Sequence, residues 1–226
     1  MPRLGRGGGS GVVKICGLTQ AEDALAAAAA GADLLGFVFF SGSRRRLDRQ
    51  ATTWIAALPQ RPPRVGVFRD QDPGFVEEVA ARAGLELVQL HGDESPEVCA
   101  ALGGRERVIK AVSVSESVDW GRVAAWAEVA QVLFDTASPT GGGTGQVFDW
   151  RLVAARPAGW PVWLAGGLRP DNVGAAIAAV RPVGVDVASG VEVAVGRKDP
   201  AKMRAFVTAA RAAWAAAADL VEREGR

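Results

Sequence analysis

A cysteine at the end of a short apolar segment is the first residue here that could do chemistry. Residues 12–16 read Val-Val-Lys-Ile-Cys, and Gly17 and Thr19 follow directly. We therefore expect a strand that presents Cys16 at its end and a capped helix soon afterwards. A thiol titrates close enough to neutral pH to act as a nucleophile or a proton-transfer group. The alternative is a small buried hydrophobic residue, as most free cysteines are.

A carboxylate follows a later apolar segment in a similar way. Asp135 lies near the end of residues 131–136, which read as another strand. A thiol and a carboxyl on opposite sides of a ligand suit a reaction that moves protons between neighbouring atoms, whereas a protease-like nucleophile would need a histidine–carboxylate relay. The alternative role for Asp135 is to cap the turn that follows it.

Two glycine loops suggest a phosphate. Gly166 and Gly167 follow one apolar segment, and Ser189 and Gly190 follow the next. Such loops leave backbone N–H groups bare, which is how many barrels bind one phosphate after their last two strands. The alternative is that these glycines only make tight strand-to-helix turns. Because two such loops are neighbours, we expect a phosphorylated small-molecule ligand.

The elements that carry these residues alternate along the chain, and we expect one (β/α)8 TIM barrel over residues 12–226 after a flexible extension over 1–11. An open doubly wound sheet is the competing architecture, but no Gly-x-Gly-x-x-Gly follows the first strand. In a barrel the active site lies where strands end, and Cys16, Asp135 and both glycine loops all fall there. The expected strands are residues 12–16, 34–40, 64–68, 85–90, 108–114, 131–136, 162–165 and 184–188, and the expected helices are residues 21–30, 49–58, 74–83, 96–102, 118–127, 149–155, 171–180 and 200–220.

Composition excludes several other classes. The chain has 226 residues and a formal net charge of +1, so it carries no electrostatic signature of a nucleic-acid partner. No apolar run is long enough to span a bilayer, and two distant cysteines favour a reducing cytoplasm over a disulfide framework. One histidine and two cysteines do not make a metal site with recognisable spacing, so we expect no metal.

Several motifs together resemble the phosphoribosylanthranilate isomerase family. They are Lys14-Ile15-Cys16-Gly17-Leu18-Thr19, Gly36-Phe37-Val38-Phe39, Gln89-Leu90-His91-Gly92, Leu133-Phe134-Asp135-Thr136, Gly142-Gly143-Thr144-Gly145 followed by Phe148-Asp149-Trp150, Leu164-Ala165-Gly166-Gly167-Leu168, Pro170-Asp171-Asn172-Val173 and Val185-Asp186-Val187-Ala188-Ser189-Gly190-Val191-Glu192. The resemblance implies an Amadori rearrangement of N-(5-phosphoribosyl)anthranilate in tryptophan biosynthesis, without metal or organic cofactor. It also implies functional coupling to other enzymes of that pathway.

The resemblance assigns roles to particular residues. It implies that Asp135 is the general acid that opens the sugar ring and that Cys16 is the general base that removes the C2 proton. Arg45, within the basic loop at 41–46, matches the arginine that holds the anthranilate end. The remaining residues expected to contact the substrate are Gly142, Gly143, Gly166, Gly167, Asp186, Ser189 and Gly190.

Two further expectations come from strand geometry and residue type. Lys14 and Cys16 share one face of a strand, and we hypothesise that Lys14 pairs with Asp186 beneath the site, either to favour the thiolate or only as a structural pair. For His91 a structural hydrogen-bonding role is favoured over catalysis. Three alternatives stay open: a related histidine-pathway isomerase, an indole-glycerol-phosphate synthase in which Lys110 would act, and a catalytically dead phosphate-binding barrel.

Overall fold

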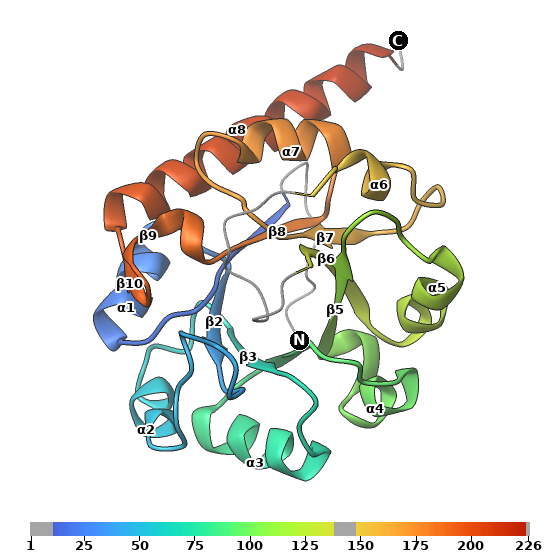
Figure 1. Cartoon of the computed structure of the whole chain (residues 1–226). Coiled ribbons are helices and arrows are strands. Elements are labelled where there is room, and N and C mark those ends of the chain that lie inside the picture. The colour runs from blue at the N-terminus through green and yellow to red at the C-terminus, as the bar shows by residue number, and fades with distance from the viewer. Residues whose placement is uncertain (1–10, 138–147, 225–226) are drawn as a thin grey trace.

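Eight parallel strands close into a barrel, which confirms the expected fold. The computed structural model describes residues 11–137 and 148–224, with side chains up to residue 219. Each strand is hydrogen-bonded to its neighbours in chain order, and β8 closes against β1. Figure 1 looks along the barrel, with the helices in a ring around the strands. The strands are β1 (Val12–Ile15), β2 (Leu34–Val38), β3 (Arg64–Phe68), β4 (Leu87–Leu90), β5 (Val108–Val114), β6 (Gln131–Thr136), β7 (Val162–Leu164) and β8 (Gly184–Val187).

The helices also fall where the sequence predicted them, with small differences at their ends. β4 begins at Leu87 instead of residue 85, because Leu85 N still donates to Ala80 O at the end of the preceding helix. One expectation was wrong: Thr19 does not cap the first helix, α1 (Ala21–Ala29). Its Oγ1 donates to Gly196 O, and Gln20 occupies the cap without a side-chain hydrogen bond. The helices are α1 (Ala21–Ala29), α2 (Ala51–Ala56), α3 (Pro73–Ala83), α4 (Pro96–Ala101), α5 (Trp120–Val129), α6 (Arg151–Ala154), α7 (Val173–Val180) and α8 (Pro200–Glu224).

A small hairpin between β8 and α8 was not predicted. It follows the 3-10 turn Ser189–Val191 and consists of β9 (Glu192–Ala194) and β10 (Arg197–Lys198), which pair antiparallel. Strands of three and two residues are too short to give a recognisable alternating pattern. The hairpin fills the connection to α8, the long helix whose far end projects beyond the barrel in Figure 1.

The strand register sorts the inward side chains into layers. Because barrel strands tilt, a residue lies at the same height as the residue that follows its hydrogen-bonded partner on the next strand. The register then places Cys16, Val67, Ala111 and Ala165 in one layer, with Val38, His91, Asp135 and Ala188 in the layer nearest the strands' carboxyl ends. The layer beneath Cys16 contains Gly36, Gln89, Leu133 and Asp186. Below these, the barrel is packed with apolar residues such as Leu34, Leu87 and Trp163.

Candidate active site

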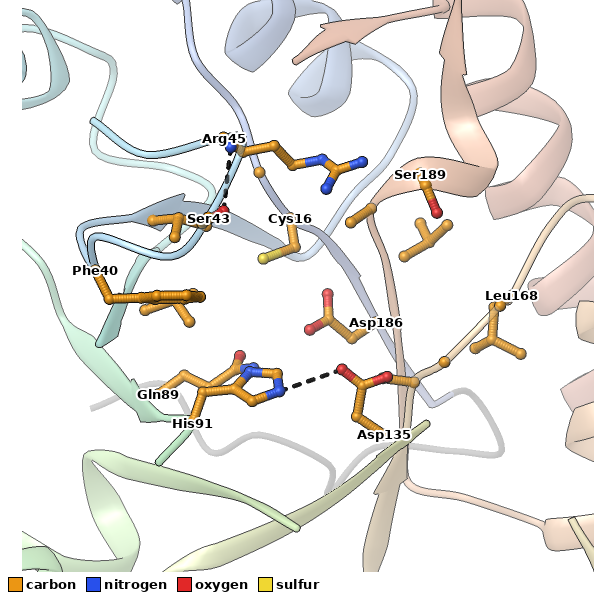
Figure 2. A pocket seen from close by; sticks show the side chains of 18 residues that line it. Cys16, Phe40, Ser43, Arg45, Gln89, His91, Asp135, Leu168, Asp186 and Ser189 are labelled. Carbon is orange, nitrogen blue, oxygen red and sulfur yellow. Dashed lines mark hydrogen bonds and ion pairs between the residues drawn. The ribbon is translucent and has the colours of Figure 1, made fainter. Parts of the chain in front are cut away.

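A pocket at the carboxyl ends of the strands gathers most of the predicted site residues. Cys16 and Asp135 line it together, with Arg45, Asp186 and Ser189 around them, as Figure 2 shows. Gly166 and Gly167 line it too, whereas Gly190 lies beside it in the same loop as Ser189. Gly142 and Gly143 lie outside the described residues. The lining also includes residues to which sequence reasoning gave no role at the site, among them Val38, Phe40, Val67 and Gln89.

Cys16 is buried above an ion pair. A Cβ on Gly36 would lie 2.8 Å from the Cys16 sulfur and 3.0 Å from Lys14 Nζ, so a glycine at this position makes room for both side chains. Burial raises the pKa of the Cys16 thiol, and the nearby Lys14 ammonium only partly offsets this effect. The free pocket therefore holds Cys16 as a neutral thiol near pH 7.

The predicted pair between Lys14 and Asp186 is confirmed. Lys14 Nζ donates to Asp186 Oδ2 at 2.7 Å inside the barrel, where the Lys14 side chain is 0% exposed. Burial is the largest influence and lowers the pKa of Lys14, but the negative charges of Asp186 and Cys16 and the hydrogen bonds to both together outweigh it and raise the pKa overall. The second oxygen, Asp186 Oδ1, is buried and has no hydrogen-bond partner among the described residues. It lies in the layer below Cys16 and is an unused acceptor at the floor of the pocket.

Asp135 contacts a residue that sequence reasoning had treated as structural. His91 Nε2 lies 3.3 Å from Asp135 Oδ2, and Figure 2 shows this contact across the pocket mouth. Asp135 Oδ1 accepts a hydrogen bond from Thr136 N at 2.8 Å. Gly166 adjoins both residues with φ of +83°, and a Cβ there would overlap Thr136 Oγ1. His91 and Asp135 lie in the same layer of the barrel. The alternating strand pattern shows which residues point inward, but the layer of each residue follows only from the strand register.

Lys110 is used elsewhere. Its Nζ donates to Gly92 O at 2.6 Å and to Ala111 O at 2.8 Å, and it lies 3.2 Å from Glu94 Oε2. Glu94 in turn accepts from Gly92 N at 3.0 Å, so the pair clamps the backbone directly after His91. Lys110 does not line the pocket, which removes the geometric basis for a lysine-dependent lyase.

The two glycine loops lie against each other at the rim of the pocket. Gly166 and Gly167 have φ of +83° and +62°, and the N–H groups of Gly166, Gly167 and Leu168 donate to no acceptor in the described part of the chain. A Cβ on Gly190 would lie 2.9 Å from the Leu168 carbonyl carbon and closer still to its oxygen. Only a glycine lets the two loops approach this closely, so the backbone N–H groups of both loops lie near one another.

Arg45 already has a partner. It is buried between the exposed Arg44 and Arg46, and its guanidinium pairs with Glu192 through two hydrogen bonds of 2.7 Å. The hydrogen bond to Glu192 raises the pKa of Arg45 further. Sequence reasoning did not connect these residues, because Glu192 reaches Arg45 from the short hairpin that was not predicted.

The opposite side of the pocket is apolar. Val38, Phe40 and Val67 pack with Cys16 in one cluster, with Ala188 against it. Figure 2 shows Phe40 on the side of the pocket opposite Asp135 and Asp186, with its ring seen edge-on. A ligand with an anionic end at the glycine loops and an apolar ring at Phe40 would place its middle atoms between Cys16 and Asp135.

Two further findings concern the described residues as a whole. Within residues 11–137 and 148–224, no three His, Cys, Asp or Glu side chains cluster as they would around a metal ion. No helix in the part of the chain that the structure describes is both long and apolar enough to cross a membrane.

Comparisons with known proteins agree with this geometry. A family model described as N-(5'phosphoribosyl)anthranilate (PRA) isomerase matches residues 13–209. An N-(5'-phosphoribosyl)anthranilate isomerase from Desulforudis audaxviator is 52% identical over 89% of this chain and 98% of its own length. One from Geobacter metallireducens is 50% identical over 88% of this chain and 98% of its own.

Solved structures give the same result. The phosphoribosyl anthranilate isomerase of Thermotoga maritima superposes with a TM-score of 0.80 at 40% identity, covering 89% of this chain and 98% of that one. A phosphoribosyl anthranilate isomerase in complex with reduced 1-(o-carboxyphenylamino)-1-deoxyribulose 5-phosphate matches with a TM-score of 0.77, at the same identity and coverage. This chain therefore belongs to the N-(5'-phosphoribosyl)anthranilate isomerase family.

Proposed function

We propose that this chain converts N-(5'-phosphoribosyl)anthranilate to 1-(2-carboxyphenylamino)-1-deoxyribulose 5-phosphate in tryptophan biosynthesis. The observation that carries the proposal is the pocket itself. A thiol and a carboxyl lie between glycine loops with free N–H groups and an apolar wall. That order matches the order of groups along the substrate, which has a phosphate at one end and an aromatic ring at the other.

Asp135 is the proposed general acid. It gives a proton to the furanose ring oxygen while the bond from that oxygen to C1 breaks, which leaves a Schiff base between C1 and the anthranilate nitrogen. Cys16, as thiolate, then removes the C2 proton to give an enolamine. A proton gained at C1 and one lost from the C2 hydroxyl complete the ketone, so substrate and product contain the same atoms.

These steps need neither metal nor organic cofactor, because each is a proton transfer between groups the chain already has. Acid and base groups each supply about 10²–10⁴-fold, and the remaining acceleration must come from positioning.

The rest of the pocket would position the substrate. The phosphate binds at Gly166, Gly167, Ser189 and Gly190 through backbone N–H groups. The free oxygen of Asp186 accepts a hydrogen bond from a sugar hydroxyl, since a buried acceptor without a donor is costly. The anthranilate ring lies against Phe40, and Arg45 meets its carboxylate. From family resemblance, Gly142 and Gly143 are included in the substrate-binding set, and the cytoplasm and the other tryptophan-pathway enzymes are the expected compartment and functional neighbours.

The test is direct. Purified protein is mixed with phosphoribosylanthranilate, and the loss of its fluorescence is followed. Saturable turnover that is abolished in Cys16→Ala and Asp135→Asn supports the proposal. No turnover by the folded wild-type protein would refute it in favour of a phosphate-binding barrel without catalysis, and turnover only of the histidine-pathway aminoaldose would assign the chain to that reaction.

A further inference from the structure

The carboxylate of Glu192 binds one edge of the Arg45 guanidinium. Arg45 Nε donates to Glu192 Oε1 and Arg45 Nη2 donates to Glu192 Oε2, each at 2.7 Å. Both side chains are buried, at 9% and 5% exposure. In this side-on arrangement the Nε–Nη2 edge of the guanidinium faces both carboxylate oxygens. The pair joins the loop after β2 to β9, so two loops of the pocket rim are tied together.

Glu192 is itself fixed from several directions. Lys198 Nζ donates to Glu192 Oε1 at 2.9 Å, and Gly196 N donates to the same oxygen at 3.3 Å. Lys202 Nζ donates to the backbone oxygen of Glu192 at 2.8 Å. Burial raises the pKa of Glu192, but the hydrogen bonds and charges of Arg45 and Lys198 outweigh it and lower the pKa overall. The carboxylate therefore stays ionised and ordered at neutral pH.

The arm of Arg45 lies against the turn that carries Cys16. Gly17 has φ of +72°, and a Cβ there would overlap Arg45 Cδ, so the bare backbone of Gly17 is the surface on which the arm rests. Figure 2 shows the guanidinium extending past Cys16 toward the side of Ser189. The Arg45 side chain is thus held at two places: its aliphatic part lies against Gly17, and its guanidinium is bound by Glu192.

This pairing leaves one edge of the guanidinium for a ligand. A guanidinium has five N–H groups, and Glu192 accepts from two of them. The other three, on Nη1 and Nη2, have no acceptor within the described residues. We propose that Glu192 is a positioning residue: it occupies the side-on edge of Arg45 and thereby makes the substrate's anthranilate carboxylate bind end-on, through Nη1 and Nη2.

This inference rests on the proposed function, since it needs a ligand with a carboxylate. Without Glu192, the ligand itself would have to order the Arg45 arm. That weakens binding of the carboxylate end but leaves the phosphate loops and the reacting carbons unchanged. A merely structural ion pair would instead affect every ligand alike.

The experiment uses Glu192→Gln, which keeps the shape of the side chain but removes its charge. We expect KM for phosphoribosylanthranilate to rise about tenfold with kcat within about threefold, the scale of one side chain that must be ordered on binding. As probes, anthranilate should lose about tenfold in competitive inhibition, and inorganic phosphate should inhibit as it does the wild type. The matched control is Glu128→Gln, an exposed glutamate on α5, which should behave as wild type in all four measurements.

A second variant, Glu192→Asp, keeps the charge, but its side chain is one methylene shorter, so its carboxylate cannot reach Arg45 Nε and Nη2 from the same backbone position. It should shift anthranilate inhibition in the same direction and leave phosphate inhibition unchanged. The inference is overturned if both variants bind anthranilate like wild type, or if anthranilate and phosphate weaken together. Absence of turnover in the wild-type protein would refute the proposed function instead, so the two failures are told apart.

Discussion

A single methyl group at position 190 should separate phosphate binding from catalysis. In Gly190→Ala the new Cβ would lie 2.9 Å from the Leu168 carbonyl carbon and closer to its oxygen, where real contacts begin near 3.4 Å. The two loops must then move apart by at least about 1 Å. A hydrogen bond of about 2.9 Å stretched by that amount is no longer a hydrogen bond.

Each lost charge-assisted hydrogen bond costs about 1.5–3 kcal/mol, so KM should rise about ten- to a hundredfold for each N–H that moves away. The phosphate is remote from C1 and C2, so kcat should stay within about threefold. Inorganic phosphate should also raise the melting temperature of the wild type by mass action but not that of the variant.

The assay is steady-state fluorescence, with melting curves to show that the variant folds. Gly174→Ala is the control, since it lies in α7 directly after the same loop and its Cβ would meet only Ala213, at 4.0 Å. An alanine inside a helix is favoured over glycine, so this control should be active and at least as stable as wild type. Wild-type KM in Gly190→Ala, or a loss of kcat with KM unchanged, would refute the phosphate assignment.

Three substitutions test the other groups. Cys16→Ser should fold and lose at least about a hundredfold in kcat, because a hydroxyl is not ionised near pH 7; retention within about tenfold contradicts a thiolate base. Arg45→Lys should cost about 1.5–3 kcal/mol, or ten- to a hundredfold in kcat/KM, while the exposed Arg44→Lys and Arg46→Lys stay near wild type; equal mild effects would mean that the loop only attracts anions. His91→Asn should lower kcat about tenfold with little change in KM, as expected for the loss of its polar contact with Asp135; an unchanged kcat would leave His91 a structural role only.

The sequence predicts the parts of the site that depend on where strands end. Cys16 and Asp135 each close an apolar run, and closed-barrel topology is enough to bring such positions to one rim. The Lys14–Asp186 pair was predictable too, because both strands meet where the barrel closes and period two fixes which face each residue takes.

Contacts that depend on exact register or on irregular chain were not predictable. His91 meets Asp135 because the shear of the barrel places them in one layer, and nothing local to either residue specifies that shear. Glu192 reaches Arg45 from a hairpin whose strands are too short to show a pattern. Thr19 was misplaced for a related reason, since its hydroxyl is taken by Gly196 in that same hairpin and not by the helix that follows it.

Burial and charge oppose each other at Cys16, and the ligand should change the balance. Burial raises the pKa of the free thiol, and Lys14 counteracts this only in part because its charge is shared with Asp186. A sugar hydroxyl that donates to Asp186 Oδ1 partly offsets the negative charge of the Asp186 carboxylate. Asp186 then offsets less of the positive charge of Lys14, and Lys14 stabilises the Cys16 thiolate more strongly. A base with a raised pKa gives a rate that rises with pH, and kcat/KM reports the free enzyme whereas kcat reports the complex. We therefore expect kcat and kcat/KM both to increase with pH above pH 7. The increase in kcat should occur at a lower pH than the increase in kcat/KM. A kcat/KM profile that rises at the same or lower pH would show that the substrate does not tune Cys16.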